Sequence, residues 1–196
     1  MKWTPSNIPF QRDTLFVITG ANAGLGLATA RALSAKGGEI VMAVRNLDKG
    51  EKAADAIRAE QPNAKLHVMA LDLSRLESIR AFANAFLASF DKLNVLINNA
   101  GIYESGIKRT AEGFALMMGV NHLGHFALTG LLLDRLLTTP HSRVVTLSSG
   151  AYRSGKLDLD NFHTIEAAAS GAYGKSKLAN MLFMRELQRR LDRINS

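Results

Sequence analysis

The sequence predicts an α/β fold, a doubly wound parallel sheet of five strands with helices on both faces. Five short apolar runs alternate with helix-forming runs along the chain, and this alternation is typical of parallel strands joined by right-handed crossovers. Polar or glycine-rich residues directly follow each apolar run, which is where such a sheet carries its ligand-binding loops. We expect one domain over residues 1–196, because this length suffices for one well-buried core.

The composition is that of a soluble globular protein, with 47% hydrophobic and 21% charged residues. Residues 1–9 lack the apolar core of a signal peptide, and no stretch contains eighteen uninterrupted apolar residues. There is no cysteine, which excludes disulfides and thiolate metal sites and is compatible with a reducing compartment. We therefore expect a cytoplasmic protein without a membrane span.

The chain is basic, with 24 Lys and Arg against 17 Asp and Glu and a net charge of +7. Such a charge suits a phosphorylated ligand or, less specifically, nucleic acid. The basic residues are scattered, without a basic stripe interleaved with aromatics. Nucleic-acid binding is therefore the weakest hypothesis.

The first structural unit follows an extended, proline-marked leader over residues 1–13. A strand at 15–19 leads into a glycine turn and then a helix over 27–36. In such a turn, backbone N–H groups and a helix N-terminus face a phosphate, which makes a bound dinucleotide the first hypothesis. Side chains would obstruct this approach at Gly20, Gly24 and Gly26.

The spacing of these glycines is four then two, which differs from the usual dinucleotide fingerprint of two then three. On this stretch alone, the glycines are also explained by tight packing of the strand on the helix.

The second and third units extend the alternation. A strand over 39–44 is apolar on both faces apart from its first residue, as a central parallel strand is, and it ends at Arg45. A helix over 48–61 ends before Pro62, and a strand over 66–71 ends at Asp72.

The next helix is the most regular in the sequence. Ser74 and Glu77 have the spacing of a capping box, and apolar residues then recur every three or four positions from Ile79 to Phe90. These apolar residues define one buried helix face.

The last two units complete the predicted sheet. A strand over 94–97 runs into residues 98–101, and a long helical region follows over 111–137. A strand over 143–147 runs into Ser148-Ser149, then a loop with at most a short helix over 151–171, and a helix over 173–192. The groups that end strands should gather along one edge of the sheet: Gly20 to Gly26, Arg45, Asp72, Asn98 to Gly101, and Ser148-Ser149.

Tyr173 and Lys177 are four residues apart on a predicted helix, so they share one face. The ammonium favours the ionised phenolate, and a tyrosine tuned this way can exchange a proton near neutral pH. Tyr152 and Lys156 have the same spacing, but they lie in a segment without helical periodicity that Gly155 interrupts. We therefore interpret Tyr173 as functional and Tyr152 as incidental.

Taken together, these motifs closely resemble those of the short-chain dehydrogenase/reductase family, whose fold is Rossmann-like. The resemblance runs from about residue 15 onward and rests on Thr19-Gly20 with Gly24 and Gly26, Leu71-Asp72-Leu73, Asn98 to Gly101, Asn121, Ser148-Ser149, and Tyr173 with Lys177. Residues 120–126 and 176–180 resemble the branch that contains retinol dehydrogenases and their bacterial relatives.

The resemblance implies roles for four catalytic residues. Tyr173 is the general acid/base at the substrate oxygen, and Lys177 favours the phenolate and holds the nicotinamide ribose. Ser149, chosen over Ser148 because the family usually uses the second serine of the pair, hydrogen-bonds the same oxygen, and Asn121 positions a proton-relay water. No metal is needed for this hydride transfer.

The resemblance also implies a nicotinamide dinucleotide site. The expected cofactor-binding residues are Gly20, Asn22, Gly24, Leu25, Gly26, Arg45, Asp72, Leu73, Asn99, Ala100, Gly101, Tyr173 and Lys177. An arginine at the end of the second strand suits a ribose 2′-phosphate, where an acid would suit a free hydroxyl, so Arg45 predicts NADP over NAD. The alternative is that Arg45 forms a salt bridge with a neighbour.

His122 and His125 are three residues apart, as two metal ligands on a helix would be. No third ligand is evident in the sequence, so we interpret both as packing residues and predict no metal site.

The family normally continues beyond the catalytic helix with further strands, a proline-glycine turn near the nicotinamide and a segment that covers the substrate. This sequence ends at Ser196. We expect an exposed sheet edge, which would favour assembly into a homo-oligomer. The leading hypothesis is an NADP(H)-dependent oxidoreductase acting on a small carbonyl or alcohol substrate, and the alternative is a truncated, non-catalytic NADP-binding module.

Overall fold

The computed structural model describes residues 4–104, 106, 108–158 and 169–194. Its centre is a parallel sheet of five strands in the order β3-β2-β1-β4-β5, which confirms the predicted fold class. The strands are β1 (Leu15–Thr19), β2 (Glu39–Val44), β3 (Lys65–Ala70), β4 (Val95–Asn98) and β5 (Arg143–Thr146). Each lies within one residue of its predicted start and end.

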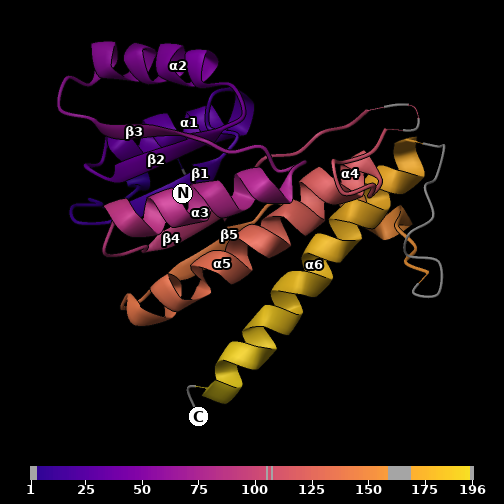
Figure 1. The fold of residues 1–196 in the computed structure, drawn as a ribbon. Helices are drawn as coiled ribbons and strands as arrows, with labels where there is room; N and C mark the ends of the chain where they lie inside the picture. Colours follow the sequence, from indigo (N-terminus) through magenta and orange to yellow (C-terminus); the bar gives the residue numbers. More distant parts are fainter. Residues whose placement is uncertain (1–3, 105, 107, 159–168, 195–196) are drawn as a thin grey trace.

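Helices cover the sheet from both sides (Figure 1). They are α1 (Gly24–Ser34), α2 (Leu47–Glu60), α3 (Leu76–Ser89), α4 (Leu116–Met118), α5 (Gly124–Thr138) and α6 (Ala169–Ile194). Three short helical segments are η1 (Pro5–Asn7), the π-helical η2 (Gly119–Leu123) and the 3-10 segment η3 (Gly150–Ser154). Figure 1 shows α1 and α2 on one side of the strands and α3 and α5 on the other.

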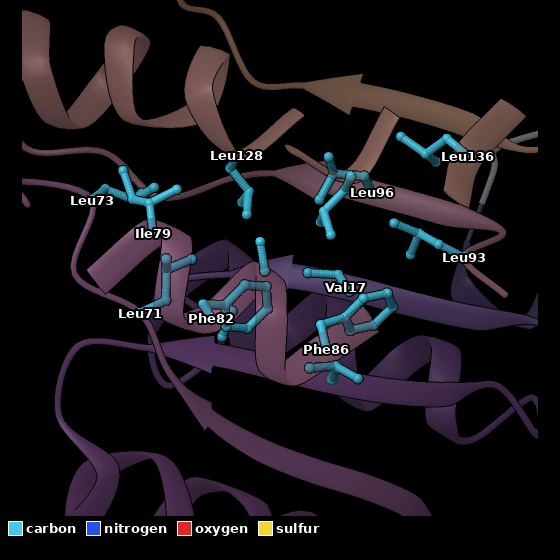
Figure 2. Packing of buried hydrophobic residues seen from close by; sticks show 14 of the residues in the cluster. Val17, Leu71, Leu73, Ile79, Phe82, Phe86, Leu93, Leu96, Leu128 and Leu136 are labelled. Atoms are coloured by element: carbon cyan, nitrogen blue, oxygen red, sulfur yellow. The ribbon is translucent and has the colours of Figure 1, made fainter. Parts of the chain in front are cut away.

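Successive strand residues point to opposite faces and build two separate cores. Phe16, Ile40 and Ile97 pack with α1 and α2. On the other face, Val17 and Leu96 pack with residues of α3 and α5. Figure 2 shows this second core, with the α3 rings Phe82 and Phe86 and the α5 side chain Leu128 gathered over the strands. Both faces of β1 are thereby buried, as its apolar run predicted.

The strand order reverses direction at β1. From β1 the chain moves outward to β3 and then crosses back to β4 on the other side of β1. Loops that leave β1 and β4 therefore turn toward opposite faces, which opens a crevice at the carboxyl ends of these strands. This topology places the glycine turn beside residues 99–101.

The capping-box prediction at the start of α3 is wrong. The residue before the helix is Arg75, without a side-chain cap, and the Ser74 hydroxyl donates instead to the Asp72 carboxylate at 2.6 Å. The backbone N–H of Leu76 donates to Glu112 Oε1 at 2.7 Å. A carboxylate from a distant loop thus takes over the role that the sequence assigns to a local cap.

The single helix predicted over 111–137 is also wrong in its first part. Residues 109 and 115 pair as an antiparallel bridge around a turn in which Gly113 has φ +86°. Helical structure begins at Leu116 and contains the π-helical segment η2 before α5. Both ends of η2 pack closely, because a Cβ on Gly119 would lie 2.1 Å from Thr110 Cγ2 and one on Gly124 would lie 2.5 Å from the Leu73 carbonyl oxygen.

The leader departs from extended backbone at Pro5–Asn7, where η1 forms a 3-10 turn. Its later part is tied to the end of α1, since the Gln11 N–H donates to the Lys36 carbonyl. At the other end of the chain, α6 begins four residues before the predicted start at Tyr173.

Among the described residues, one helical stretch, Leu116–Thr138, has the length and apolar composition of a membrane span. Half of it is buried within the fold. Leu128, Leu132 and Leu136 of this stretch belong to the core beneath the sheet. Core packing therefore accounts for its apolar character.

Candidate active site

A cleft of about 740 Å³ opens at the carboxyl ends of the strands. This volume is in the range of small-molecule and cofactor sites. The cleft is lined by Thr19, Gly20, Asn22, Ala23, Gly24, Leu25, Ala43, Arg45, Asn46, Lys49, Leu71, Asp72, Leu73, Asn99, Ala100, Gly101, Ile102, Tyr103, Val120, Leu147, Ser148, Tyr173 and Lys177. Of the predicted cofactor-binding residues, all but Gly26 lie in this lining.

The glycine turn forms one wall of the cleft. Gly20 and Gly24 have φ of +68° and +54°, a region that favours glycine. The helix α1 starts at Gly24 without a side-chain cap, so its first backbone N–H groups are free of capping side chains. These donors and the helix dipole suit an anion at the cleft wall.

Gly26 serves packing rather than direct access to a phosphate. A Cβ at this position would lie 2.5 Å from the Gly20 carbonyl oxygen and 2.6 Å from Asn99 Nδ2. Gly26 therefore lets α1 approach the turn and the neighbouring loop. The packing explanation thus holds for Gly26, and a Cβ on Gly20 would also lie close to Ala100, at 3.1 Å from its Cβ.

Thr19 joins the glycine turn to the loop after β4. Its hydroxyl oxygen accepts hydrogen bonds from the backbone N–H groups of Asn99 and Ala100, both at 2.9 Å. Asn99 Nδ2 also donates to the Thr19 carbonyl at 2.8 Å. Three hydrogen bonds thus hold together two predicted cofactor-binding loops.

Two cations stand at the end of the cleft next to β2. Arg45 is exposed and forms no salt bridge with another residue in the described part of the chain. The alternative, in which Arg45 pairs with a neighbouring residue, is therefore not seen there. Lys49 also lines the cleft, and its backbone N–H donates to Asn46 Oδ1, the cap of α2, at 2.9 Å. The sequence pattern did not mark Lys49 or Asn46 as site residues, although both follow Arg45 at the same strand end.

The loop after β3 lines the middle of the cleft. The Asp72 carboxylate accepts from the N–H of Ser74 at 2.9 Å, besides the Ser74 hydroxyl. The Asp72 N–H donates to the Ser78 hydroxyl at 2.9 Å. Leu73 is buried and packs against the start of α5. These contacts fix the Asp72 carboxylate and backbone within the cleft lining.

Tyr173 and Lys177 project from α6 into the other end of the cleft. Lys177 is only 4% exposed, and its Nζ donates to the Leu147 carbonyl at 3.2 Å and lies 5.6 Å from the centroid of the Tyr173 ring. Burial lowers the pKa of the Lys177 ammonium. The structure thus brings the predicted phenol and ammonium together.

Tyr103 packs edge-on against Tyr173, with ring centroids 5.2 Å apart. It is 63% exposed and lines the cleft. The sequence pattern did not single it out, because nothing local marks a loop tyrosine as a neighbour of another tyrosine seventy positions later.

The two serines after β5 differ in their surroundings. Ser148 lines the cleft, and its hydroxyl donates to the Lys177 carbonyl at 2.9 Å. Ser149 does not line the cleft and caps η3, where its Oγ accepts from the Ala151 N–H at 3.3 Å. The choice of Ser149 as the substrate-binding serine stays a prediction.

Tyr152 lies on η3, outside the cleft lining. Gly155 ends this segment and lies against α6, since a Cβ there would be 2.4 Å from the Gly174 carbonyl oxygen. Lys156 therefore follows the end of the helical turn, and Tyr152 and Lys156 share no helix face.

Asn121 is completely buried beside the cleft. Its Oδ1 accepts from the Ile102 N–H at 2.8 Å, and its Nδ2 donates to the Ile102 carbonyl and to the Ser176 hydroxyl, both at 3.0 Å. Its amide donors are therefore fully used within the protein.

His122 and His125 have separate partners. His122 Nδ1 lies 3.1 Å from Asn180 Oδ1, whereas the His125 ring lies between Thr19 and the Asn121 carbonyl. In the part of the chain that the structure describes, no group of three potential metal-binding side chains occurs.

The family model for short chain dehydrogenases matches residues 14–195. The chain belongs to the short-chain dehydrogenase family. Retinol dehydrogenase 12 of Mus musculus is 50% identical over 179 residues, covering 89% of this chain and 56% of that protein. Dehydrogenase/reductase SDR family member 13 of Bos taurus is 48% identical over 187 residues, covering 92% of this chain and 48% of that protein. The chain therefore spans about half the length of these relatives.

Two solved structures share the fold. A crystal structure of an uncharacterised protein from Mycobacterium paratuberculosis superposes with a TM-score of 0.88 at 42% identity, covering 100% of this chain and 69% of that one. A short chain dehydrogenase from Escherichia coli CFT073, complexed with NADPH, gives a TM-score of 0.77 at 25% identity, covering 92% and 71%. The chain is thus a retinol-dehydrogenase-like member of an oxidoreductase family with a Rossmann-like fold.

Proposed function

We propose that this chain carries the cofactor and proton-transfer machinery of an NADP(H)-dependent oxidoreductase that interconverts a carbonyl and an alcohol. One observation carries the proposal. The cleft joins an anion-binding helix start and two cations at one end to a paired phenol and ammonium at the other. A dinucleotide phosphate spans such a cleft, with its charge at one end and its reactive ring at the other.

The residues present fit this cofactor. The uncapped start of α1 at Gly24 supplies N–H donors for a pyrophosphate. Arg45 and Lys49 supply positive charge for a 2′-phosphate, and a planar guanidinium binds phosphate in two-point fashion. Residues 99–101, Tyr173 and Lys177 would line the ribose and nicotinamide.

When bound, the nicotinamide supplies or accepts the hydride. Tyr173 donates its phenolic proton to the oxygen of the carbonyl as that oxygen gains negative charge, and takes the proton back in alcohol oxidation. Lys177 stabilises the resulting phenolate, because its buried ammonium acts where water screens charge poorly. Ser149 would hydrogen-bond the same substrate oxygen, and Asn121 would position a relay water for the proton.

The substrate is a small carbonyl or alcohol compound. The retinol dehydrogenases among the relatives carry the name of an apolar alcohol. Tyr103 offers an exposed aromatic surface directly beside Tyr173 in this chain. Retinol and retinal are therefore the first substrates to assay, next to simple aldehydes and ketones.

The test is the oxidation of NADPH in the presence of aldehyde, together with the Tyr173→Phe variant. We expect Tyr173→Phe to lower kcat by about 100- to 10,000-fold, the usual contribution of general acid/base catalysis, and to leave the Kd for NADPH within about 2-fold. An unchanged rate in Tyr173→Phe would remove this residue from the mechanism. Lys175→Met on the same helix is the matched control, because Lys175 does not line the cleft.

A second candidate function is NADP binding without turnover. Val145 on β5, the edge strand of the described sheet, is 44% exposed. NADPH binding without oxidation by any aldehyde would support this function. Assembly into a homo-oligomer, a cytoplasmic location and the absence of nucleic-acid binding stay predictions.

A further inference from the structure

His125 is a buried titratable side chain that the proposed mechanism does not use. It lies in the first turn of α5 and is 1% exposed. Its Nε2 lies 2.9 Å from the Thr19 hydroxyl oxygen, and its Nδ1 lies 3.1 Å from the Asn121 carbonyl oxygen. The ring therefore connects the residue before the glycine turn to the π-helical segment η2.

The hydrogen bonds of Thr19 determine which ring nitrogen carries the proton. Its hydroxyl oxygen has two lone pairs, and both accept backbone N–H groups, from Asn99 and Ala100. The hydroxyl proton then needs an acceptor, and His125 Nε2 at 2.9 Å is closer than the Ile97 carbonyl at 3.4 Å. An Nε2–H group would face an oxygen without a free lone pair. The ring must therefore be neutral, with its proton on Nδ1 and donated to the Asn121 carbonyl.

We propose that neutral His125 is a positioning residue for the cofactor cleft: by accepting a hydrogen bond from the Thr19 hydroxyl, it orients Thr19 to hold the Asn99-Ala100 backbone against the glycine turn. The Nδ1–H of the same ring donates to the Asn121 carbonyl. The cofactor part of this inference rests on the proposed function, whereas the hydrogen-bond arrangement does not.

The surroundings of the ring agree with a neutral state. The pKa of His125 is lowered to about 4, chiefly by burial, against the opposing hydrogen bond to Asn121 and with smaller contributions from the Lys177 ammonium on α6 and His122 on η2. At neutral pH the ring thus carries the single proton that its partners require.

The first test reads the free protein without cofactor. Long-range ¹H–¹⁵N correlation spectra should show His125 as the Nδ1–H tautomer at pH 7, with the exposed His141 as internal reference. An Nε2–H tautomer or a charged ring at pH 7 would overturn the proposal. In His125→Phe, the backbone amide hydrogens of Asn99 and Ala100 should exchange with solvent faster than in the parent chain. This increase in rate should exceed the increase at the amides of β2. Unchanged exchange at these two amides would also overturn it.

The second test is a double-mutant cycle on the Kd for NADPH. We expect His125→Phe to weaken binding by about 3- to 10-fold, the range of one lost hydrogen bond, and Thr19→Val to weaken it more, because its hydroxyl makes three hydrogen bonds. In the double variant the His125 effect should disappear, because it acts through the Thr19 hydroxyl. Thr19→Ser, which keeps the hydroxyl, should bind like the parent chain, as should the matched change His67→Phe on β3.

The proposal is contradicted if the effects of the two single variants on the Kd for NADPH multiply in the double variant, because a merely structural role of the ring is independent of the Thr19 hydroxyl. It is also contradicted if His125→Phe leaves this Kd unchanged. A parent chain that binds neither NADPH nor NADH would refute the proposed function and with it the cofactor role of His125. In that outcome, the tautomer and the amide exchange still decide the hydrogen-bond arrangement.

Discussion

Gly26→Ala adds only one methyl group, but we expect it to disturb the wall of the cleft. In Gly26→Ala the new Cβ would lie 2.5 Å from the Gly20 carbonyl oxygen and 2.6 Å from Asn99 Nδ2. Contacts between such atoms normally begin above about 3.4 Å, so something must move by about 1 Å. The backbone of Gly20 cannot swing aside as a flexible side chain would, and Asn99 is held by its 2.8 Å hydrogen bond to the Thr19 carbonyl.

The magnitude combines two opposing contributions. Alanine inside a helix is favoured over glycine by about 1 kcal/mol. Overpacking against backbone costs about 1 to 3 kcal/mol, and a lost Asn99 hydrogen bond about 1 kcal/mol more. We therefore expect a net loss of about 1 to 3 kcal/mol in the free energy of unfolding. Because the displaced groups line the phosphate wall, the Kd for NADPH should also rise by about 10-fold or more.

The assay is urea unfolding followed by circular dichroism, with NADPH titration of the folded variant. Gly130→Ala is the matched control, because Gly130 is exposed in the middle of α5 and its added Cβ would meet no atom within 4 Å. This control should be stabilised by about 0.5 to 1 kcal/mol and bind NADPH like the parent chain. A Gly26→Ala chain as stable as Gly130→Ala, with unchanged NADPH affinity, would refute the close-approach argument.

Two further perturbations follow from the same structure. Arg45→Ala should weaken NADPH binding by about 10- to 100-fold, the range of a lost charged hydrogen bond, and leave NADH nearly unchanged. Equal loss for both cofactors would exclude the 2′-phosphate role, and the exposed Arg190→Ala on α6 is the control. The stability of the chain should also fall in acid: His125 has a pKa of about 4 when folded against 6.5 when unfolded. Between these pH values the unfolded chain binds a proton that the folded chain excludes, so the free energy of unfolding should fall as the pH is lowered, by on the order of 3 kcal/mol in all. Denaturant titrations from pH 7 to 4 should show a weaker pH dependence in His125→Gln, and an identical profile would contradict a buried neutral ring.

Local sequence signals were sufficient for much of the fold. Short apolar runs place all five strands within one residue, because a central parallel strand must be apolar on both faces. The spacing of Tyr173 and Lys177 places them on one helix face, and Gly155 explains why Tyr152 and Lys156 do not share one. These features depend on backbone geometry over a few residues, which the sequence itself encodes.

Other features depend on groups that are distant in sequence. The α3 start is capped by Glu112, thirty-six residues away from Leu76, so the local Ser74 pattern misleads. Lys49 and Tyr103 reach the cleft because strand ends converge there, and no local motif marks them.

The sequence by itself determined the order of the strands along the chain, the glycine turn and the identity of the phenol and the ammonium, since each follows from periodicity or spacing. Only the tertiary structure decided how the turn is held. Thr19 meets Asn99, Ala100 and His125 across 80, 81 and 106 positions. Which lone pair accepts which proton depends on all of these partners at once, and that arrangement exists only when the sheet and α5 are packed together.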